Sequence, residues 1–266
     1  MSSVSLQYLL KSKSFKFMKD RKDKSHKLES YIWNGKPVYY RTSTSDMIII
    51  YEILLKTGYE SEYWLPIEIE PEIILDIGGN IGITSIYLAN RFPNAKIYTF
   101  EPLPQNFEIL EKNIKDYNNI TAFNVGLGIS DGSFDIYMSD DSENFGGASL
   151  YADTSVVNQS SKVTCKVRSA NDMLKEIGIS KIDLIKIDTE GAEYDILTSI
   201  NKDSISQVKW ITGELHGNKD FELLDYLEKL SFSISMKKSI DNKLFMFNCA
   251  KEDVINKLSK EDKLNL

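Results

Sequence analysis

Two groups of polar residues in this sequence have the types and spacing to do chemistry. The first is Asp76 with the turn 78–82, which reads Gly-Gly-Asn-Ile-Gly. The second is Asp188 with Glu190, which follows an apolar run at 182–187. Glycines after a strand let the backbone approach a bound nucleotide closely, and paired carboxylates can orient or accept a proton. We therefore expect a cofactor site and a proton-handling site on one sheet.

The glycine spacing favours S-adenosylmethionine over a dinucleotide. A dinucleotide-binding loop reads G-x-G-x-x-G. Counted from Gly78, its later glycines would stand where this chain has Asn80 and Ile83. A carboxylate on the preceding strand can instead reach the cationic methionine end of S-adenosylmethionine. We expect Asp76 to do so through the amino group or a bridging water, with Gly78 and Asn80 beside the cofactor.

Two further segments are expected to complete the cofactor site. Glu101 ends the apolar run 96–100, so its carboxylate is placed to accept hydrogen bonds from the ribose hydroxyls. Asn124 and Gly126 follow at the end of the next strand-like run, 120–125. We expect them to form the adenine edge of the site.

The next strand adds a histidine to the proton-handling site. Glu214 and His216 should point to the same side of the sheet, because side chains alternate along a strand. His216 can take a proton from a substrate hydroxyl near neutral pH. A purely structural His216 is the simpler alternative. Asp188, Glu190, Glu214 and His216 could instead hold a divalent ion, but no ligand spacing enforces one, so no metal ligand is assigned. Lys186, a cation in an apolar strand, needs an acidic partner such as Glu190 or Glu214.

Alternating strand and helix patterns from residue 73 onward predict the sheet that carries these residues. Such alternation is typical of an α/β fold, doubly wound around a mostly parallel sheet with helices on both faces. A strand-rich insertion with a polar loop interrupts it after the third strand. The expected strands are 73–77, 96–100, 120–125, 182–187 and 208–212, with a final hairpin of 232–236 and 244–247.

Residues 1–70 are expected to form an elaboration on the main domain, 71–266. Residues 1–27 carry a net charge of +6 on a pattern typical of solvated helices. That basic segment could alternatively touch an anionic membrane surface or a partner protein. Asn34-Gly35 predicts a hairpin, and Asp46 is a candidate cap for the helix that follows.

Charge and composition exclude several classes of protein. The whole chain carries −7, so the part after residue 27 is strongly acidic, which argues against a large nucleic-acid footprint. The two cysteines form no CxxC, which suits buried thiols in a reducing compartment, so we expect a cytoplasmic protein. No apolar run reaches the roughly 18 residues of a membrane span, and the N-terminus lacks the pattern of a signal peptide.

These motifs together resemble the FkbM family of S-adenosylmethionine-dependent methyltransferases. Residues 186–193, Lys-Ile-Asp-Thr-Glu-Gly-Ala-Glu, are similar to the family's K-x-D-x-E-G-x-E signature, and 76–82 are similar to its D-x-G-x-N-x-G loop. Phe-Glu-Pro at 100–102 resembles the ribose-binding strand end, and Glu-Leu-His at 214–216 resembles the E-x-H after the fifth strand. The resemblance covers roughly 71–250. Two departures, Thr189 for the usual Val and Gly79 for the common Ala, remove no functional atom.

The resemblance implies a fold and a reaction. The fold is a Rossmann-like class I methyltransferase sheet of seven strands with the last strand antiparallel. The reaction is O-methylation of a hydroxyl group, commonly on sugars of glycans, on glycolipids or on secondary metabolites. The acceptor oxygen would attack the methyl in line while His216, or Asp188 with Glu190, removes or orients its proton, and S-adenosylhomocysteine would be the product.

The sequence leaves open which residues form the acceptor pocket and allows two other classes of protein. We expect the loop 139–150 and the N-terminal elaboration to shape a pocket for a small-molecule or glycan acceptor, with Tyr137 and Phe145 as candidate stacking platforms. The sequence assigns no role to the rest of the loop, up to residue 161. An NAD(P)-dependent oxidoreductase on the same sheet is one alternative. A cofactor-binding module without catalysis is the other.

Overall fold

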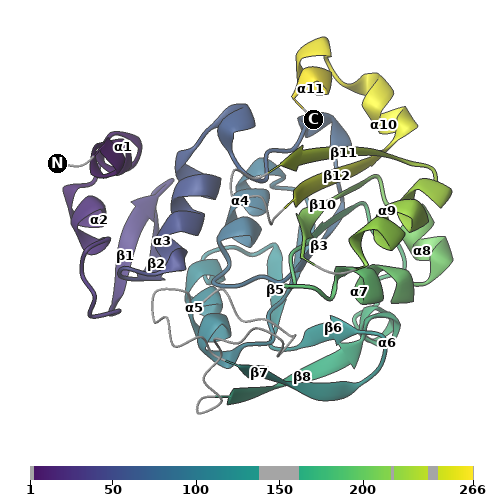
Figure 1. Ribbon diagram of the computed structural model, residues 1–266, viewed down its shortest axis with the longest axis horizontal. Coiled ribbons are helices and arrows are strands. Elements are labelled where there is room, and N and C mark those ends of the chain that lie inside the picture. The colour runs from purple at the N-terminus through teal and green to yellow at the C-terminus, as the bar shows by residue number, and fades with distance from the viewer. Residues whose placement is uncertain (1–2, 138–161, 217–218, 239–244, 266) are drawn as a thin grey trace.

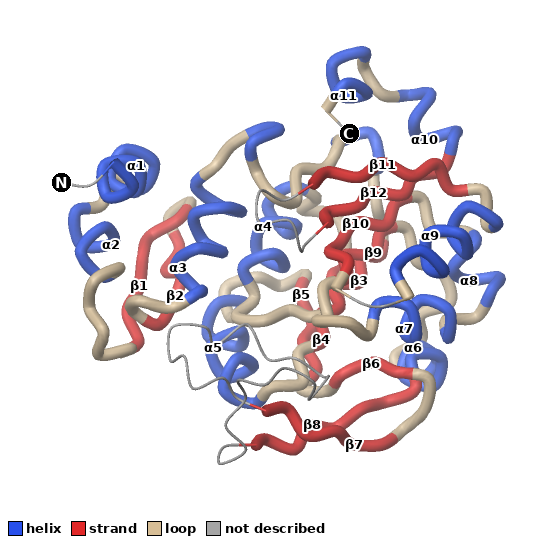
Figure 2. The backbone as a smooth tube through the Cα atoms, in the orientation of Figure 1, coloured by secondary structure: helices blue, strands red, loops and turns tan. Residues whose placement is uncertain are grey.

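The computed structural model describes residues 3–137, 162–216, 219–238 and 245–265. Its centre is a seven-stranded sheet in the order β11-β12-β10-β9-β3-β4-β5 (Figures 1 and 2). Strands β10, β9, β3, β4 and β5 run parallel, and β12 is antiparallel to both of its neighbours. The expected α/β fold with an antiparallel last strand is confirmed. The strands are β3 (Ile73–Ile77), β4 (Lys96–Phe100), β5 (Ile120–Phe123), β9 (Leu184–Ile187), β10 (Trp210–Leu215), β11 (Phe232–Lys238) and β12 (Phe245–Lys251).

The chain direction across the sheet reverses beside β3, and this reversal places the site. From β3 the chain continues outward to β4 and β5, and it then returns to add β9 on the other side of β3. The last residues of β3 and β9, Ile77 and Ile187, lie side by side in parallel register. In such sheets ligands bind outside the carboxyl ends of the strands at this switch point.

Two buried clusters cover the two faces of the sheet. Along β3, Ile74 belongs to one cluster and Leu75 to the other, as the two-residue period of a strand requires. Helices α4 and α5 lie on the face shared with the N-terminal elements, and α6 to α9 lie on the opposite face (Figure 1). The helices are α4 (Ile83–Arg91), α5 (Pro104–Ile114), α6 (Ala170–Glu176), α7 (Glu193–Ser199), α8 (Lys202–Ser206), α9 (Asp220–Lys229), α10 (Glu252–Lys257) and α11 (Lys260–Leu264).

Residues 3–70 form helices, a hairpin and short turns that pack on the α4 face. The hairpin turns at Asn34-Gly35, both with positive φ, as its sequence predicts. Tyr40 and Met47 share a buried cluster with residues of the sheet, so one core joins the two parts, and a domain boundary at residue 70 stays a prediction. The elements are α1 (Ser3–Ser12), α2 (Phe15–Asp20), β1 (Leu28–Trp33), β2 (Lys36–Arg41), α3 (Ser45–Ile49), η1 (Ile50–Leu55), η2 (Gly58–Glu60) and η3 (Ile67–Ile69).

Three local expectations differ from the structure. Thr44, not Asp46, caps α3, because the Asp46 carboxylate is fully occupied by the Arg41 guanidinium and backbone. Strand β5 ends at Phe123, and the insertion forms a separate sheet of β6 (Gly126–Gly128), β8 (Lys162–Ser169) and β7 (Gly132–Tyr137). Strand β10 runs three residues beyond the expected end at 212, because its antiparallel partner β12 pairs with it through Leu215. No helix in the described ranges is long and apolar enough to cross a membrane.

Candidate active site

A cleft at the carboxyl ends of the central strands brings most of the expected site residues together. Gly78 and Asn80 follow β3, Glu101 follows β4, Gly126 begins β6, and Asp188 and Glu190 follow β9. All six line this one cleft, together with apolar side chains that include Phe100, Leu127, Phe134 and Ile196. Asp76, Asn124 and His216 do not line it.

Gly78 links the two halves of the cleft. Its φ is +83°, and a Cβ built there would stand 1.8 Å from the carbonyl oxygen of Asp188. Neither the backbone conformation nor the space admits a side chain. The glycine expected for a cofactor loop is therefore also what lets that loop touch the chain after β9.

Glu101 presents the buried carboxylate of the cofactor half. It is 6% exposed, and its two oxygens accept backbone hydrogen bonds from Asn80 N at 2.8 Å and Leu103 N at 2.9 Å. Burial raises the pKa of Glu101 to about 7, although the two N–H groups act in the opposite direction. Asn124 supports this turn from behind, since its Nδ2 donates to the carbonyl oxygens of Glu101 and Pro102 at 2.9 and 3.3 Å.

Asp76 and Lys186 form a buried pair beneath the cofactor loop. They are opposite one another in the β3–β9 register, which places Lys186 Nζ 3.4 Å from Asp76 Oδ1. The amine also donates to Gly78 O at 2.7 Å and lies 3.9 Å from Asp188 Oδ2. The acids paired with Lys186 are thus Asp76 and Asp188 rather than Glu190 or Glu214, because strand register decides which side chains meet.

The Asp76 carboxylate is fully buried and is already engaged within the protein. Besides Lys186, it accepts hydrogen bonds from the hydroxyl groups of Ser85 and Thr99. Burial opposes the charge of Lys186, but the nearby Asp76 and Asp188 carboxylates raise the pKa of the amine. Asp76 therefore fixes the loop through Lys186, and a direct contact of Asp76 with the cofactor stays a prediction.

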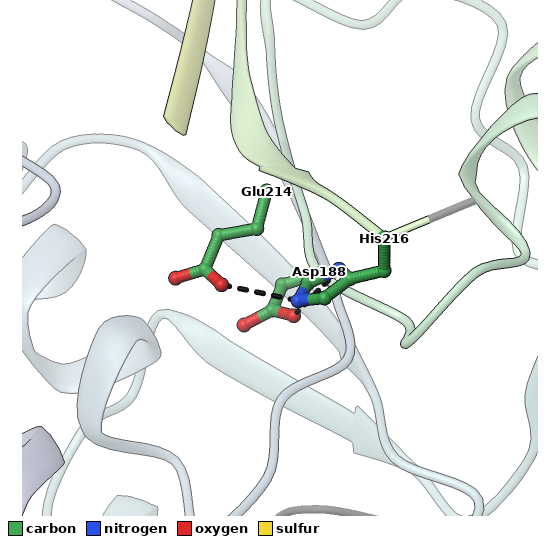
Figure 3. Close-up of side chains that lie close together, drawn as sticks. All are labelled: Asp188, Glu214 and His216. Atoms are coloured by element: carbon green, nitrogen blue, oxygen red, sulfur yellow. Dashed lines mark ion pairs between the residues drawn. The ribbon is translucent and has the colours of Figure 1, made fainter. Parts of the chain in front are cut away.

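His216 lies in a ring of carboxylates just beyond β10. Its Nε2 is 3.2 Å from Glu214 Oε2 and its Nδ1 is 3.4 Å from Glu193 Oε1. Oxygens of Asp188 and Glu190 are 4.0 and 3.9 Å from the ring nitrogens. Figure 3 shows Asp188 and Glu214 pointing toward the imidazole. Both ring nitrogens therefore face acids, and the side chain is only 8% exposed.

This surrounding changes the chemistry expected of His216. Burial by itself would lower the pKa of His216, but the hydrogen bonds with Glu193 and Glu214 and the charges of the other acids raise it to about 11. The ring is then an imidazolium at neutral pH and has no free nitrogen to accept a proton. The expectation that His216 takes a proton near neutral pH is opposed by this charge state. Its charge instead offsets the mutual repulsion of the acids around it.

Glu190 is better placed to exchange a proton with a bound molecule. It lines the cleft and its side chain is 39% exposed, and its φ of +56° is unusual for a residue with a side chain. Burial, and then the neighbouring Asp188 carboxylate, raises the pKa of Glu190 to about 7. A carboxylate that titrates near neutral pH inside a cleft suits a general base.

Three site residues were not assigned from the sequence. Glu193 Oε1 accepts hydrogen bonds from Thr189 N and Gly191 N and also contacts His216 Nδ1, so this acid holds the turn that opens α7. Its position in the 186–193 motif was the available signal. Glu62 and Tyr63 reach the acids from a loop before β3, and no local pattern marks them. Of the candidate stacking platforms, Phe145 and the side chain of Tyr137 lie outside the described residues, as does the whole loop 139–161.

The alternative of a divalent ion has a geometric basis in the described residues. Ligand atoms of Asp188, Glu214 and His216 all lie within 4.8 Å of one another. An imidazolium held by carboxylates accounts for the same arrangement, and an ion would first have to displace its proton. Ion pairing is therefore the interpretation that agrees with the contacts of both ring nitrogens.

The sequence comparison decides the family. The profile described as "Methyltransferase FkbM domain" matches residues 76–234, which is more than half of the chain. The chain belongs to the FkbM methyltransferase family. The matched range contains every residue of the cleft and the acid cluster named above except Glu62 and Tyr63. S-adenosylmethionine is accordingly the cofactor of this domain, in place of the nicotinamide cofactor of an oxidoreductase.

Relatives of this FkbM domain have varied names. The chain is 29% identical over 206 residues to the AMB antimetabolite synthetase AmbE of Pseudomonas aeruginosa, covering 62% of this chain and 10% of that protein. It is 26% identical over 152 residues to the hexuronic acid methyltransferase AglP of Haloferax volcanii, covering 57% and 59%. It is 22% identical over 196 residues to the 2-O-methyltransferase NoeI of Sinorhizobium fredii, covering 66% and 79%. The matched segments thus span less than two thirds of AmbE and of AglP.

One solved structure of an FkbM methyltransferase is also similar. The protein from Methylobacillus flagellatus shares 16% identity with a TM-score of 0.47, covering 77% of this chain and 53% of that chain. A likeness at this level concerns the fold alone, so the choice of acceptor has to be argued from the cleft.

Proposed function

We propose that this protein transfers a methyl group from S-adenosylmethionine to a hydroxyl group, on a sugar of a glycan or on a secondary metabolite. The observation that carries the proposal is the composition of the cleft. One wall carries the Gly78–Asn80 turn and Glu101, and the other carries Asp188 and Glu190. A cofactor wall and a proton-accepting wall therefore face the same space.

The residues of the first wall fit the cofactor. Glu101 offers a buried carboxylate to the ribose hydroxyls, while Leu127 and Phe134 offer apolar surface to the adenine beside Gly126. Gly78 has no Cβ to meet the carbonyl oxygen of Asp188, so the loop that would hold the cofactor can lie against the chain after β9. When bound, S-adenosylmethionine supplies an electrophilic methyl group on a sulfonium.

The second wall performs the proton handling. Glu190 accepts the proton of the acceptor hydroxyl, and Asp188 orients that hydroxyl through a hydrogen bond. His216 remains charged and keeps Glu193 and Glu214 in place, which is a positioning role. Holding a nucleophile and an electrophile in line can contribute about 7–11 kcal/mol to lowering a barrier.

The acceptor class rests on chemistry and on two relatives. Hydroxyl groups are the natural donors to a cluster of carboxylates, and AglP and NoeI are named for hexuronic acid methylation and 2-O-methylation. A sugar hydroxyl is therefore the acceptor we put first. The strongly acidic body disfavours a nucleic-acid acceptor. Both cysteines are free and buried, in agreement with a cytoplasmic site of action.

A binding measurement followed by an activity measurement tests this proposal. Thermal unfolding is recorded with S-adenosylhomocysteine and, separately, with NADH. A ligand at 100 times its dissociation constant stabilises the native state by about 2.7 kcal/mol, so a saturable rise with S-adenosylhomocysteine alone is expected. A rise with NADH alone would restore the oxidoreductase alternative.

The second stage uses labelled S-adenosylmethionine and a panel of acceptors. The panel contains neutral hexoses, hexuronic acids, their methyl glycosides and matched 2-deoxy sugars. We expect label in a sugar that keeps its hydroxyl and none in the deoxy analogue. Cofactor binding without transfer to any hydroxylated compound would favour the non-catalytic module.

A further inference from the structure

The segment 61–65 lies before the family domain but is firmly attached beside the acid cluster. Ser61 Oγ donates to Ile53 O at 3.0 Å, and Glu62 N donates to Glu52 O at 3.2 Å. The flanking side chains of Tyr63 and Leu65 are buried in the core shared by the N-terminal elements and the sheet. These contacts hold the loop in a defined place at the carboxyl end of β9.

Tyr63 supplies a hydrogen-bond donor to the reaction centre. Its hydroxyl group donates to Asp188 Oδ2 at 3.3 Å, and Lys186 Nζ lies 5.4 Å from the centre of its ring. The side chain is 2% exposed. Burial, followed by the charge of Asp188, raises the pKa of Tyr63 well above its usual value, so the hydroxyl keeps its proton and remains a donor.

Glu62 faces Glu214, a second acid of the cluster around His216. Its carboxyl group is hydrogen-bonded to that of Glu214, and it lines a small second cavity with Tyr63, Lys186 and Asp188. Two carboxyl groups can share a hydrogen bond only if one of them is protonated. Burial, then the charges of Glu214, Asp188 and Glu52, raises the pKa of Glu62 to about 9, so Glu62 is the member that carries the proton.

We propose that Glu62 and Tyr63 are positioning residues of the methyltransferase reaction centre, contributed by the N-terminal segment to a site that the family domain leaves incomplete. Tyr63 fixes Asp188, and Glu62 fixes Glu214, which in turn holds His216 Nε2. This inference rests on the proposed function for its activity readouts only. Its structural readouts need no acceptor.

Neutral donors suit this position for an electrostatic reason. Asp188, Glu190, Glu193 and Glu214 already crowd around His216, and a further cation would compete with Lys186 for the same oxygens. A protonated carboxyl and a phenol orient two of these acids without changing the net charge of the cluster. The alternative is that Glu62 and Tyr63 serve folding alone, and the experiments below separate the two roles.

The first experiment measures the hydrogen bonds directly in the full chain. Infrared spectroscopy at pH 8, where Glu101 and Glu190 are largely ionised and Glu62 is not, should show a protonated-carboxyl band that is lost in Glu62→Gln. The chain has two histidines, so nitrogen-15 spectra of the imidazoles are readily assigned with a His26→Gln variant. Glu62→Ala should shift the His216 Nε2 signal more than the Nδ1 signal, because Glu214 faces Nε2. An unchanged carboxyl band, or unchanged His216 signals in a folded Glu62→Ala, overturns the proposal for Glu62.

The second experiment measures turnover with S-adenosylmethionine and the sugar methylated in the panel above. Glu62→Ala should lower kcat about tenfold and leave KM for the cofactor nearly unchanged, which is the fold-change of losing one good hydrogen bond. Glu62→Gln keeps a donor and should restore kcat to within about threefold of the wild type. Tyr63→Phe should lower kcat several-fold. Equal activity of folded Glu62→Ala and wild type would contradict the positioning role.

Neighbouring residues provide matched controls. Glu60, on the same segment, pairs with Lys11 at the surface, and the Tyr59 hydroxyl donates to Asp262. Glu60→Gln and Tyr59→Phe should therefore leave kcat unchanged. The pH profile adds a discriminating readout: wild-type kcat should fall above about pH 9, where Glu62 ionises against Glu214, Asp188 and Glu52, and Glu62→Gln should lack that fall. If no sugar is methylated, the proposed acceptor fails while the infrared and histidine results still decide this inference.

Discussion

The two walls of the cleft are built in different ways. The cofactor wall consists mainly of backbone. Its one carboxylate, Glu101, is held by the N–H group of Asn80, which follows the neighbouring strand, and by that of Leu103, two residues further along the chain. The acid wall presents Asp188 and Glu190 to the cleft. Side chains from the loop before β3, from α7, from β10 and from just beyond it hold these two acids and one another by charge and hydrogen bonds. A backbone-built wall is local and rigid. A charge-built wall depends on every member, so a change at one acid alters the others.

The largest effect is expected from Gly78→Ala on the cofactor wall. The added Cβ would meet the Asp188 carbonyl at 1.8 Å, so the loop must move, and affinity for S-adenosylhomocysteine should fall at least a hundredfold by calorimetry. Gly178 also has positive φ, at +74°, but open space around its Cα. Gly178→Ala should lower the free energy of unfolding by about 1–2 kcal/mol through backbone strain and leave the affinity for S-adenosylhomocysteine unchanged. Equal losses in both variants would mean that strain, not contact between the walls, matters.

The next effect belongs to the acid wall. Glu190→Gln should lower kcat about a hundredfold, the lower end of the usual contribution of a general base, with little change in cofactor affinity. Because the pKa of Glu190 is about 7, wild-type kcat should rise with pH through that value and the variant should lack this limb. Asp195→Asn alters an acid on α7 that pairs with Lys219 at the surface. It is the control and should leave kcat unchanged. Full activity in Glu190→Gln would move the proton-accepting role to Asp188.

His216→Gln tests the idea that charge holds the acid wall together. Removing one partner of a buried ion cluster leaves uncompensated charge and costs about 3–5 kcal/mol of stability. The pKa of His216 is raised from 6.5 to about 11 on folding, so its stabilisation is fully present below pH 6.5 and is lost as pH rises toward 11. Urea unfolding should therefore show a gap between wild type and variant that narrows from pH 7 to pH 10. A gap that widens would indicate a neutral imidazole in the native state.

The smallest effect returns to the cofactor wall. Glu101 must be ionised to accept hydrogen bonds with both oxygens, and its pKa is about 7. Affinity for S-adenosylhomocysteine should thus weaken several-fold as pH falls from 8 to 6, measured by calorimetry. Glu101→Gln should bind more weakly at pH 8 and lose this pH dependence. The same slope in wild type and variant would assign the dependence to another group.

Much of this structure could be anticipated from local patterns, and the exceptions have physical causes. Ile73 to Ile77 is apolar except for Asp76, so a buried parallel strand was the natural prediction. The partner of Lys186 was predicted wrongly, because strand register rather than sequence distance brings it to Asp76. The charge of His216 could not be predicted for a similar reason, since it depends on Glu193, which α7 places against the ring. The role of His216 in the reaction stays a prediction.

The sequence by itself determined the order of strands and helices, the glycine turn at Gly78, the acidic strand end at Glu101 and the family. Each of these depends on residues that are close together in the sequence, so their types and spacing are enough to predict it. Only the tertiary structure decided which acids surround His216 and that Glu62 and Tyr63 join them. Burial and charge depend on which residues the whole fold brings close together. Tyr63 and Glu62 are far along the chain from Asp188 and Glu214, so no local sequence pattern could predict these contacts.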